Sequence, residues 1–176
     1  MNIRFELSSI NKRSEALEYI NEFERYQSDI HGVGGLDIKN YEVWVEKSLD
    51  SHQGIETRPN RVPASTYYVY NDANVLVGMI NIRHYLNQFL ITTGSGHVGY
   101  SVRPTQRRKG YAKAMLHQAL LILKDDFKVT EALVGCYKHN IGSKKTIIAN
   151  GGVLKEEILE ENGFITLAFT IDLTVK

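Results

Sequence analysis

The sequence predicts a single α/β domain over residues 1–176. Three observations lead to this prediction. The length suits one hydrophobic core. The composition, 43% hydrophobic and 23% charged, is that of an ordinary globular protein. Apolar residues repeat every second position in some segments and every three to four in others, which indicates strands and helices in succession.

The N-terminal part is predicted to form one strand, Ile3 to Leu7, and two helices. The first helix would begin at Asn11 or Ser14, and the second after Asp37 as its N-cap. Their buried faces would be formed by Ala16, Tyr19, Ile20, Phe23 and Tyr26, and by Tyr41, Trp44, Val45, Ser48 and Leu49. The segment 27–36 contains Gly32, Gly34 and Gly35 and reads as a loop.

Residues 51–64 show no periodic pattern, and Pro59 and Pro63 disfavour both a helix and a central strand. Such a stretch inside a compact domain is often functional. Two interpretations stay open here, a lid on the substrate side and a plain surface connection.

Strands are predicted next. Residues 65–70 and 75–84 flank the turn Asn71-Asp72-Ala73-Asn74 and read as a hairpin. A further extended piece is expected near Phe89 to Thr92. The strand from His97 to Val102 is ended by Pro104.

The strongest helix signal follows that strand. Its apolar residues, Ala112, Met115, Leu116, Ala119, Leu120 and Leu123, lie on one helical face. A strand at 131–137 comes next, so this strand–helix–strand unit predicts one parallel strand pair. A shorter helix from about Asn140 should end at Asn150-Gly151-Gly152, and a closing hairpin should turn at Glu161-Asn162-Gly163.

Charge and cysteine content exclude several classes. With 21 Lys and Arg against 20 Asp and Glu, the net charge of +1 gives no general field for nucleic acid or an anionic membrane. The single cysteine, Cys136, permits no internal disulfide and favours a reducing compartment. Residues 1–6 lack the pattern of a signal peptide, and no apolar run approaches the ~18 residues of a membrane span. We therefore expect a cytoplasmic protein with neither a membrane nor a nucleic acid as partner.

The segment from Val102 to Ala112 connects a buried strand to the strongest helix, a place where open α/β sheets bind ligands. Basic residues gather there, namely Arg103, Arg107, Arg108, Lys109 and Lys113. Free N–H groups at a helix N-terminus attract phosphate oxygens, and Gly110 lets the backbone approach a ligand. A basic surface loop explains the charge alone. The glycine, the small Ala112 and the strand–loop–helix order favour a phosphate site.

The run Arg107-Arg108-Lys109-Gly110-Tyr111-Ala112 resembles the Arg/Gln-x-x-Gly-x-Gly/Ala signature of the GNAT family of N-acetyltransferases. Asn140-Ile141-Gly142-Ser143 resembles the family's later Asn-x-x-Ser element, and Asn150-Gly151-Gly152 stands where the family has a helix break. The order fits from about Ser65 to Thr170. The resemblance implies contacts of coenzyme A with Val102, Arg107, Arg108, Lys109, Gly110, Tyr111, Ala112, Asn140 and Ser143.

The resemblance also implies a fold. This would be a mixed, mostly antiparallel central sheet with one parallel strand pair, flanked by about four helices. The runs Gly78 to Asn87 and Gly96 to Tyr100 are similar to those of a bacterial branch usually labelled only as predicted acetyltransferases.

The function implied is acetyl-CoA-dependent transfer of an acetyl group to an amine, by direct attack in a ternary complex. The acceptor would be a small molecule or a peptide, the protein a monomer or homodimer, and no metal is expected, since no zinc motif is present. Amine attack needs a base, and His97 is the first candidate. A histidine hydrogen-bonded within the sheet is the alternative for that position. His84 and Asn87 are candidates for binding the acceptor.

One position departs from the family pattern. Many members have a tyrosine seven residues after the Asn of Asn-x-x-Ser, as the acid that protonates the leaving thiolate. Ile147 stands there in this chain. Either another group serves instead, with Tyr137 as a candidate, or the thiolate leaves unassisted.

Two other functions remain open. A non-catalytic acyl-CoA-binding module would use the same loop. A nucleic-acid-binding domain would use the basic residues, against the near-zero net charge and the lack of interleaved aromatics. The run Gly94 to Gly99 matches the dinucleotide pattern G-x-G-x-x-G, but it leads into a strand rather than opening a helix.

Overall fold

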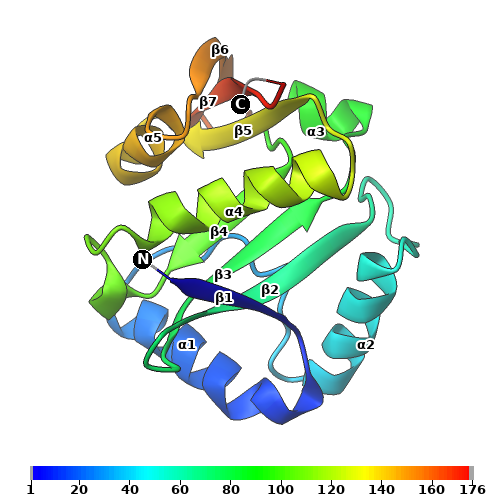
Figure 1. Cartoon of the computed structure of the whole chain (residues 1–176), viewed down its shortest axis with the longest axis vertical. Helices are drawn as coiled ribbons and strands as arrows, with labels where there is room; N and C mark the ends of the chain where they lie inside the picture. The colour runs from blue at the N-terminus through cyan, green and yellow to red at the C-terminus, as the bar shows by residue number, and fades with distance from the viewer. Residues whose placement is uncertain (1, 175–176) are drawn as a thin grey trace.

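The computed structural model describes residues 2–174 and contains two antiparallel sheets (Figure 1). The first has the strand order β1-β2-β3-β4 and the second β5-β7-β6. The strands are β1 (Ile3–Leu7), β2 (Ala64–Asn71), β3 (Leu76–Arg83), β4 (Val98–Val102), β5 (Glu131–Tyr137), β6 (Val153–Leu159) and β7 (Ile165–Asp172).

Five α-helices and two short 3-10 helices are described. They are η1 (Ile10–Lys12), α1 (Arg13–Arg25), α2 (Tyr41–His52), α3 (Gln88–Thr92), η2 (Pro104–Gln106), α4 (Tyr111–Asp125) and α5 (Ile141–Ile148). Helix α4 lies between the two sheets (Figure 1). No helix in the described range 2–174 is long and apolar enough to cross a membrane.

Helices cover both faces of the first sheet because successive strand residues point to opposite sides. Tyr68 and Tyr70 of β2 pack with α1 and α2, whereas Val69 between them packs with α4. The α4 side continues through the inward residues of β5 and β7, among them Val134 and Phe169. One apolar core therefore joins the two sheets through α4.

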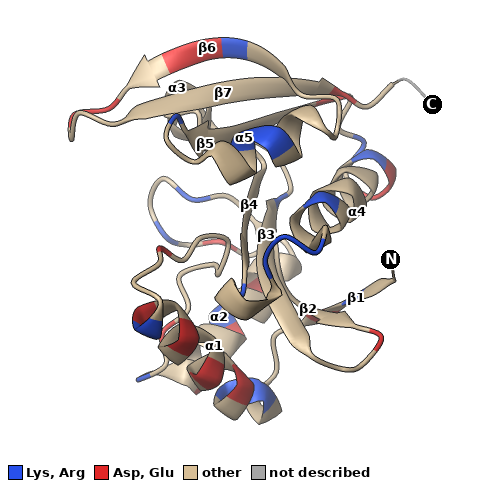
Figure 2. Ribbon diagram, turned by 90° about the vertical axis from the view of Figure 1, so that its left-hand side faces the viewer, with Lys and Arg blue, Asp and Glu red and all other residues tan. Residues whose placement is uncertain are grey.

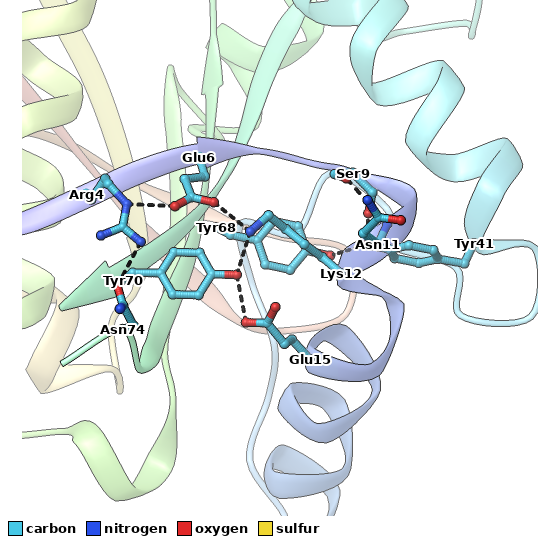
Figure 3. A network of polar contacts seen from close by, with 10 residues as sticks. All are labelled: Arg4, Glu6, Ser9, Asn11, Lys12, Glu15, Tyr41, Tyr68, Tyr70 and Asn74. Carbon is cyan, nitrogen blue, oxygen red and sulfur yellow. Dashed lines mark hydrogen bonds and ion pairs between the residues drawn. The ribbon is translucent and has the colours of Figure 1, made fainter. Parts of the chain in front are cut away.

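A polar network attaches the N-terminal segments to the first sheet (Figure 3). The ammonium group of Lys12 donates to Glu6 over 2.6 Å and to the Tyr70 hydroxyl over 3.0 Å. The Tyr70 hydroxyl in turn donates to Glu15 of α1 over 2.8 Å. Burial acts to lower the pKa of Lys12, but its bonds to Glu6 and Tyr70 outweigh this and raise it. The network fixes where α1 begins.

The two sheets meet where β4 begins and then diverge. The N–H of His97 donates to the carbonyl of Leu133 over 2.7 Å, beside an isolated bridge between Gly96 and Val134. Every described strand ladder is antiparallel, and β4 and β5 belong to different sheets. The predicted parallel pair is therefore not confirmed, because the two strands separate instead of forming a ladder.

The α/β fold class is confirmed, and local corrections concern short elements. The extended piece predicted near Phe89 to Thr92 is wrong, because this stretch forms α3, with the Asn87 side chain accepting from the Leu90 N–H over 3.0 Å. The N-cap of α2 is Asn40 rather than Asp37. The Asp37 carboxylate instead accepts the N–H groups of Lys39 and Asn40, which forms the turn that precedes the helix.

Candidate active site

Three cavities lie next to one another in the structure. The α4 cavity, about 460 Å³, lies against the loop before α4 and the start of α5. The central cleft, about 220 Å³, lies between Gly99 and Tyr100 of β4 and Gly135 to Tyr137 of β5. The arginine cavity, about 370 Å³, is named for Arg58, Arg61 and Arg83. Shared lining residues connect each cavity to the next.

The backbone of the loop before α4 forms an anion site. Arg108 has φ 63° and Gly110 has φ 87°, so left-handed residues alternate with others along the loop. Such alternation turns successive N–H groups toward one point. The first helical bond of α4 runs from the Ala114 N–H to the Gly110 carbonyl, which leaves the N–H groups of the preceding turn directed at the cavity. Glycine is the residue that adopts φ 87° without steric cost.

The basic side chains of this loop divide into two groups, although Figure 2 shows them as one blue stretch. Arg107 points to the scaffold: its guanidinium donates to the Val102 carbonyl and the Ser28 hydroxyl and lies 5.4 Å from the Phe23 ring centre. The Lys109 ammonium donates to Gln106. Arg108 lines the α4 cavity and has no hydrogen-bond partner within residues 2–174. Arg108 is thus available to a ligand, as are Lys113 and Lys145, which line the same cavity.

A buried carboxylate on α1 holds the start of the loop. Glu22, 5% exposed, accepts from the Thr105 N–H and hydroxyl, each over 2.8 Å, and from Arg103 Nε over 2.5 Å. Burial acts to raise the pKa of Glu22, but the bonds from Thr105 and Arg103 outweigh it and the pKa is lowered. The carboxylate is therefore charged at neutral pH and fixes η2 against α1.

Asn140 and Ser143 lie on the other wall of the α4 cavity. The Asn140 side chain accepts from the Ser143 N–H over 3.0 Å and so begins α5. The Ser143 hydroxyl shares a 2.8 Å hydrogen bond with the Tyr100 hydroxyl, and burial raises the pKa of Tyr100 to about 12. Tyr100 lines both the central cleft and the α4 cavity. Its hydroxyl therefore lies where the two spaces join.

His97 lies in a position that suits structure better than proton transfer. It is 5% exposed, and its Nδ1 accepts the Leu133 N–H over 3.0 Å. A neutral imidazole with Nδ1 as acceptor carries its proton on Nε2 and has no second lone pair to offer. Burial lowers the pKa of His97 to about 4. His97 lines none of the three described cavities, and this geometry opposes its predicted role as the base.

The structure does not bring the predicted acceptor residues His84 and Asn87 to the cavities described here. His84 hydrogen-bonds the Ser65 hydroxyl over 2.9 Å and stacks on Phe127 at 4.0 Å. Burial, with a smaller effect of nearby His52, lowers the pKa of His84 to about 4. Asn87 caps α3.

Arg83 occupies the place that the sequence assigned to His84. It immediately precedes His84 at the end of β3 and lines both the arginine cavity and the central cleft. Neighbouring strand residues point to opposite sides of the sheet, so the residue that lines the cavity is the one directly before the predicted His84.

His31 is the second residue that the sequence analysis missed. It lines all three cavities, and its ring lies edge-on to Tyr137 with centres 6.2 Å apart. Its carbonyl accepts from the Ser101 hydroxyl of β4. Next to it, a side chain on Gly32 would meet the Gly99 carbonyl at 2.2 Å, so the glycine-rich loop packs backbone to backbone on β4. In the sequence, only the glycines of this loop indicate that it approaches another backbone closely.

Ile147, at the position of the family's tyrosine, has no exposed surface and packs in the apolar core against Gly152. It therefore directs nothing toward the cavities. Tyr137 does line the central cleft, together with Cys136, whose thiol pKa is raised by burial.

An α/β fold whose two sheets diverge beside a backbone anion site is suited to bind a phosphate-bearing ligand. The chain belongs to the acetyltransferase (GNAT) family, whose model matches residues 23–147. It is an acetyltransferase, and acetyl-CoA is the donor that this family uses. The phosphates of that donor are anions, which the backbone anion site at Arg108 and Gly110, called the anion nest below, is suited to bind.

Solved structures with the same fold are acetyltransferases of several kinds. The microcin C7 self-immunity acetyltransferase, solved with acetyl-CoA and AMP, is 13% identical and aligns with a TM-score of 0.73 over 97% of this chain and 92% of its own. A ribosomal-protein-S5-alanine acetyltransferase from Vibrio fischeri is 14% identical, with a TM-score of 0.72 over 99% and 94%. A spermidine N-acetyltransferase from Vibrio cholerae is 12% identical, with a TM-score of 0.69 over 98% and 94%. No curated protein sequence matches the chain.

Proposed function

We propose that this protein is an N-acetyltransferase in which an amine attacks acetyl-CoA directly, within a ternary complex in the cytoplasm. The observation that carries the proposal is continuity: the anion nest, the central cleft and the arginine cavity share lining residues along one path. A donor in the α4 cavity and an acceptor in the arginine cavity can therefore meet in the cleft. Acetyl-CoA supplies the acetyl group as an activated thioester.

The chain's contribution at the donor end is binding. The N–H groups around Gly110 and the side chain of Arg108 would hold the pyrophosphate. In the cleft, the β4 edge away from β3 would accompany the pantetheine arm, because β4 pairs only with β3 along its length. Asn140 and Ser143 close the same space from α5.

The acceptor amine must lose a proton when its nitrogen bonds the acetyl carbon. We assign this proton to His31 in place of His97, because His31 is exposed and lines both the acceptor side and the cleft. Breaking of the carbon–sulfur bond leaves a thiolate, which needs a proton. The Tyr100 hydroxyl, at the junction of the cleft and the α4 cavity, is placed to supply it.

The neighbours' names do not single out one acceptor, since they include spermidine and a ribosomal protein.

The decisive experiment has two stages. Acetyl-CoA at ~100 times its dissociation constant should add about 2.7 kcal/mol of stability, a melting shift of roughly 5–10 °C for a domain of this size. A panel of amines is then tested for release of the free coenzyme A thiol.

Both stages have an outcome that contradicts the proposal. An equal melting shift with NAD would show that the nest is not selective for coenzyme A. Binding of acetyl-CoA with no thiol release by any amine would favour the non-catalytic acyl-CoA-binding module.

A further inference from the structure

The walls of the arginine cavity carry more positive than negative charge. Three arginines, Arg58, Arg61 and Arg83, line it with one carboxylate, Glu56. Arg58 and Glu56 form a two-point ion pair, with Nε to Oε1 at 2.8 Å and Nη2 to Oε2 at 2.5 Å. Burial acts to raise the pKa of Glu56, but Arg58 outweighs it and the pKa falls to about 2. Arg58 is thus neutralised, and Arg61 and Arg83 are left.

Only one nitrogen of the Arg83 guanidinium, Nη1, is hydrogen-bonded to the described part of the protein. Its Nη1 donates to the carbonyls of Gly96 and Ser95 over 2.7 and 3.2 Å. Its Nε and Nη2 have no hydrogen-bond partner in the described range 2–174, and no carboxylate there pairs with it. Burial, and to a smaller degree the charge of Arg61, lowers the pKa of Arg83 to about 10. The group is still a cation at neutral pH.

Arg61 brings a second unpaired guanidinium to the same cavity. It lies against Gly35, where an added Cβ would be 3.4 Å from its Nη2. Its side chain makes no hydrogen bond or ion pair with any residue from 2 to 174. Glu56, the one carboxylate in the described lining, is bound to Arg58. Arg61 and Arg83 therefore repel each other, and an anion bound between them removes that repulsion.

We propose that the acceptor amine also carries an anionic group, a carboxylate or a phosphate, which Arg61 and Arg83 bind. Guanidinium forks match both groups because they donate two parallel hydrogen bonds. An acceptor with only positive charges meets the same two arginines and is disfavoured. This inference rests on the proposed function, since it names the class of amine that the arginine cavity admits.

The first test measures anion binding and needs no substrate. The protein, both free and saturated with acetyl-CoA, is titrated calorimetrically with inorganic phosphate and with propionate at constant ionic strength. Arg61→Gln and Arg83→Gln should each weaken anion binding at least ~10-fold, the loss of a charge-assisted hydrogen bond. Lys155→Gln, which removes an exposed charge on β6, is the matched control and should change nothing. Arg83→Lys keeps the positive charge but loses the two parallel hydrogen-bond donors, so its anion affinity should lie between those of wild type and Arg83→Gln.

The second test uses pairs of amines that differ in one anionic group, O-phosphoethanolamine with ethanolamine and β-alanine with β-alaninamide. We expect the anionic member to have a kcat/KM ~10–100-fold higher, and Arg83→Gln to remove that advantage through KM. The pair with the larger difference tells whether phosphate or carboxylate is preferred.

The outcomes separate this inference from the proposed function. Wild-type protein that binds acetyl-CoA but neither anion, or that acetylates putrescine better than both anionic amines, overturns the inference and leaves the enzyme assignment intact. Anion binding lost in the Arg61 and Arg83 variants, in a protein that does not bind acetyl-CoA, would support the anion site and overturn the proposed function.

Discussion

His97 and Leu133 exchange two hydrogen bonds across the junction of the two sheets. The His97 N–H donates to the Leu133 carbonyl, and the Leu133 N–H donates to Nδ1 of the imidazole. The side chain thus takes the place of a backbone carbonyl in the pairing. Beyond this point β4 and β5 belong to different sheets, and the central cleft lies between them.

Replacing His97 distinguishes a positioning residue from a base. His97→Ala leaves the Leu133 N–H without a partner, and we expect a loss of about 1–3 kcal/mol in the free energy of unfolding, measured with urea. His97→Asn offers an amide oxygen near the position of Nδ1, so stability and kcat should stay near wild type. If the Asn variant lost activity as completely as the Ala variant, His97 would be the base after all.

The same histidine predicts a pH dependence of stability. The folded pKa, about 4, lies below the ordinary value of 6.5, so the unfolded chain binds the proton first as pH falls. This stability is fully present above pH 6.5 and is lost as pH falls toward 4, by at most ~1.4 kcal/mol per pH unit. Urea titrations between pH 7.5 and 4.5 should show a smaller slope in His97→Asn; an unchanged slope would contradict the lowered pKa.

Substitutions at Gly110 separate backbone strain from ligand repulsion. Gly110→Ala places a side chain at φ 87° and should cost about 1–2 kcal/mol of stability while weakening acetyl-CoA binding only partly. Gly110→Glu adds a carboxylate where phosphate must lie and should abolish the melting shift with acetyl-CoA. Normal binding by the Glu variant, measured calorimetrically, would place the pyrophosphate elsewhere.

The assignment of the proton acceptor is tested at His31. His31→Gln should lower kcat by roughly 10²–10⁴-fold with little change in acetyl-CoA affinity, because the nest is untouched. His84→Gln is the control, since His84 faces Phe127, and its kcat should remain near wild type. Full activity of His31→Gln would point to a base that acts through water.

Two tyrosine variants test protonation of the thiolate. Tyr100→Phe removes the hydroxyl between the cleft and the α4 cavity, and Tyr137→Phe removes one from the cleft wall. We expect a larger fall in kcat for Tyr100→Phe, and a much smaller fall with an acetyl donor whose thiol is more acidic. Equal, minor effects of both variants would mean that the thiolate leaves unassisted.

Local sequence patterns predicted the parts of this protein that depend on neighbours in the chain. The helix α4 and the glycine at its start follow from periodicity and from backbone geometry, so the loop at Gly110 could be predicted. The stretch from Phe89 to Thr92 could not, because four apolar or β-branched residues fit a strand equally well and the cap at Asn87 decides for a helix.

The acceptor side depends on contacts between distant segments. Arg61 and Arg83 come from a patternless loop and a strand end, and only the fold shows that both line one cavity without a paired carboxylate. His31 lies in a loop that has no periodic pattern of apolar residues, so the sequence does not indicate where its side chain points. His84 was predicted because the sequence does not show which face of β3 lines the cavities. The roles of all these residues in catalysis and binding stay predictions.

The contact between Gly32 and Gly99 has a consequence for how the enzyme meets its substrates. Two backbones touch there, with no room for a methyl group added at Gly32. The loop bearing His31 cannot slide along β4 without breaking that contact, so the spacing between the proposed proton acceptor and β4 is set when the chain folds. The proposed alignment of His31 with the donor would thus be preorganised, and binding energy from either substrate need not be spent on assembling it.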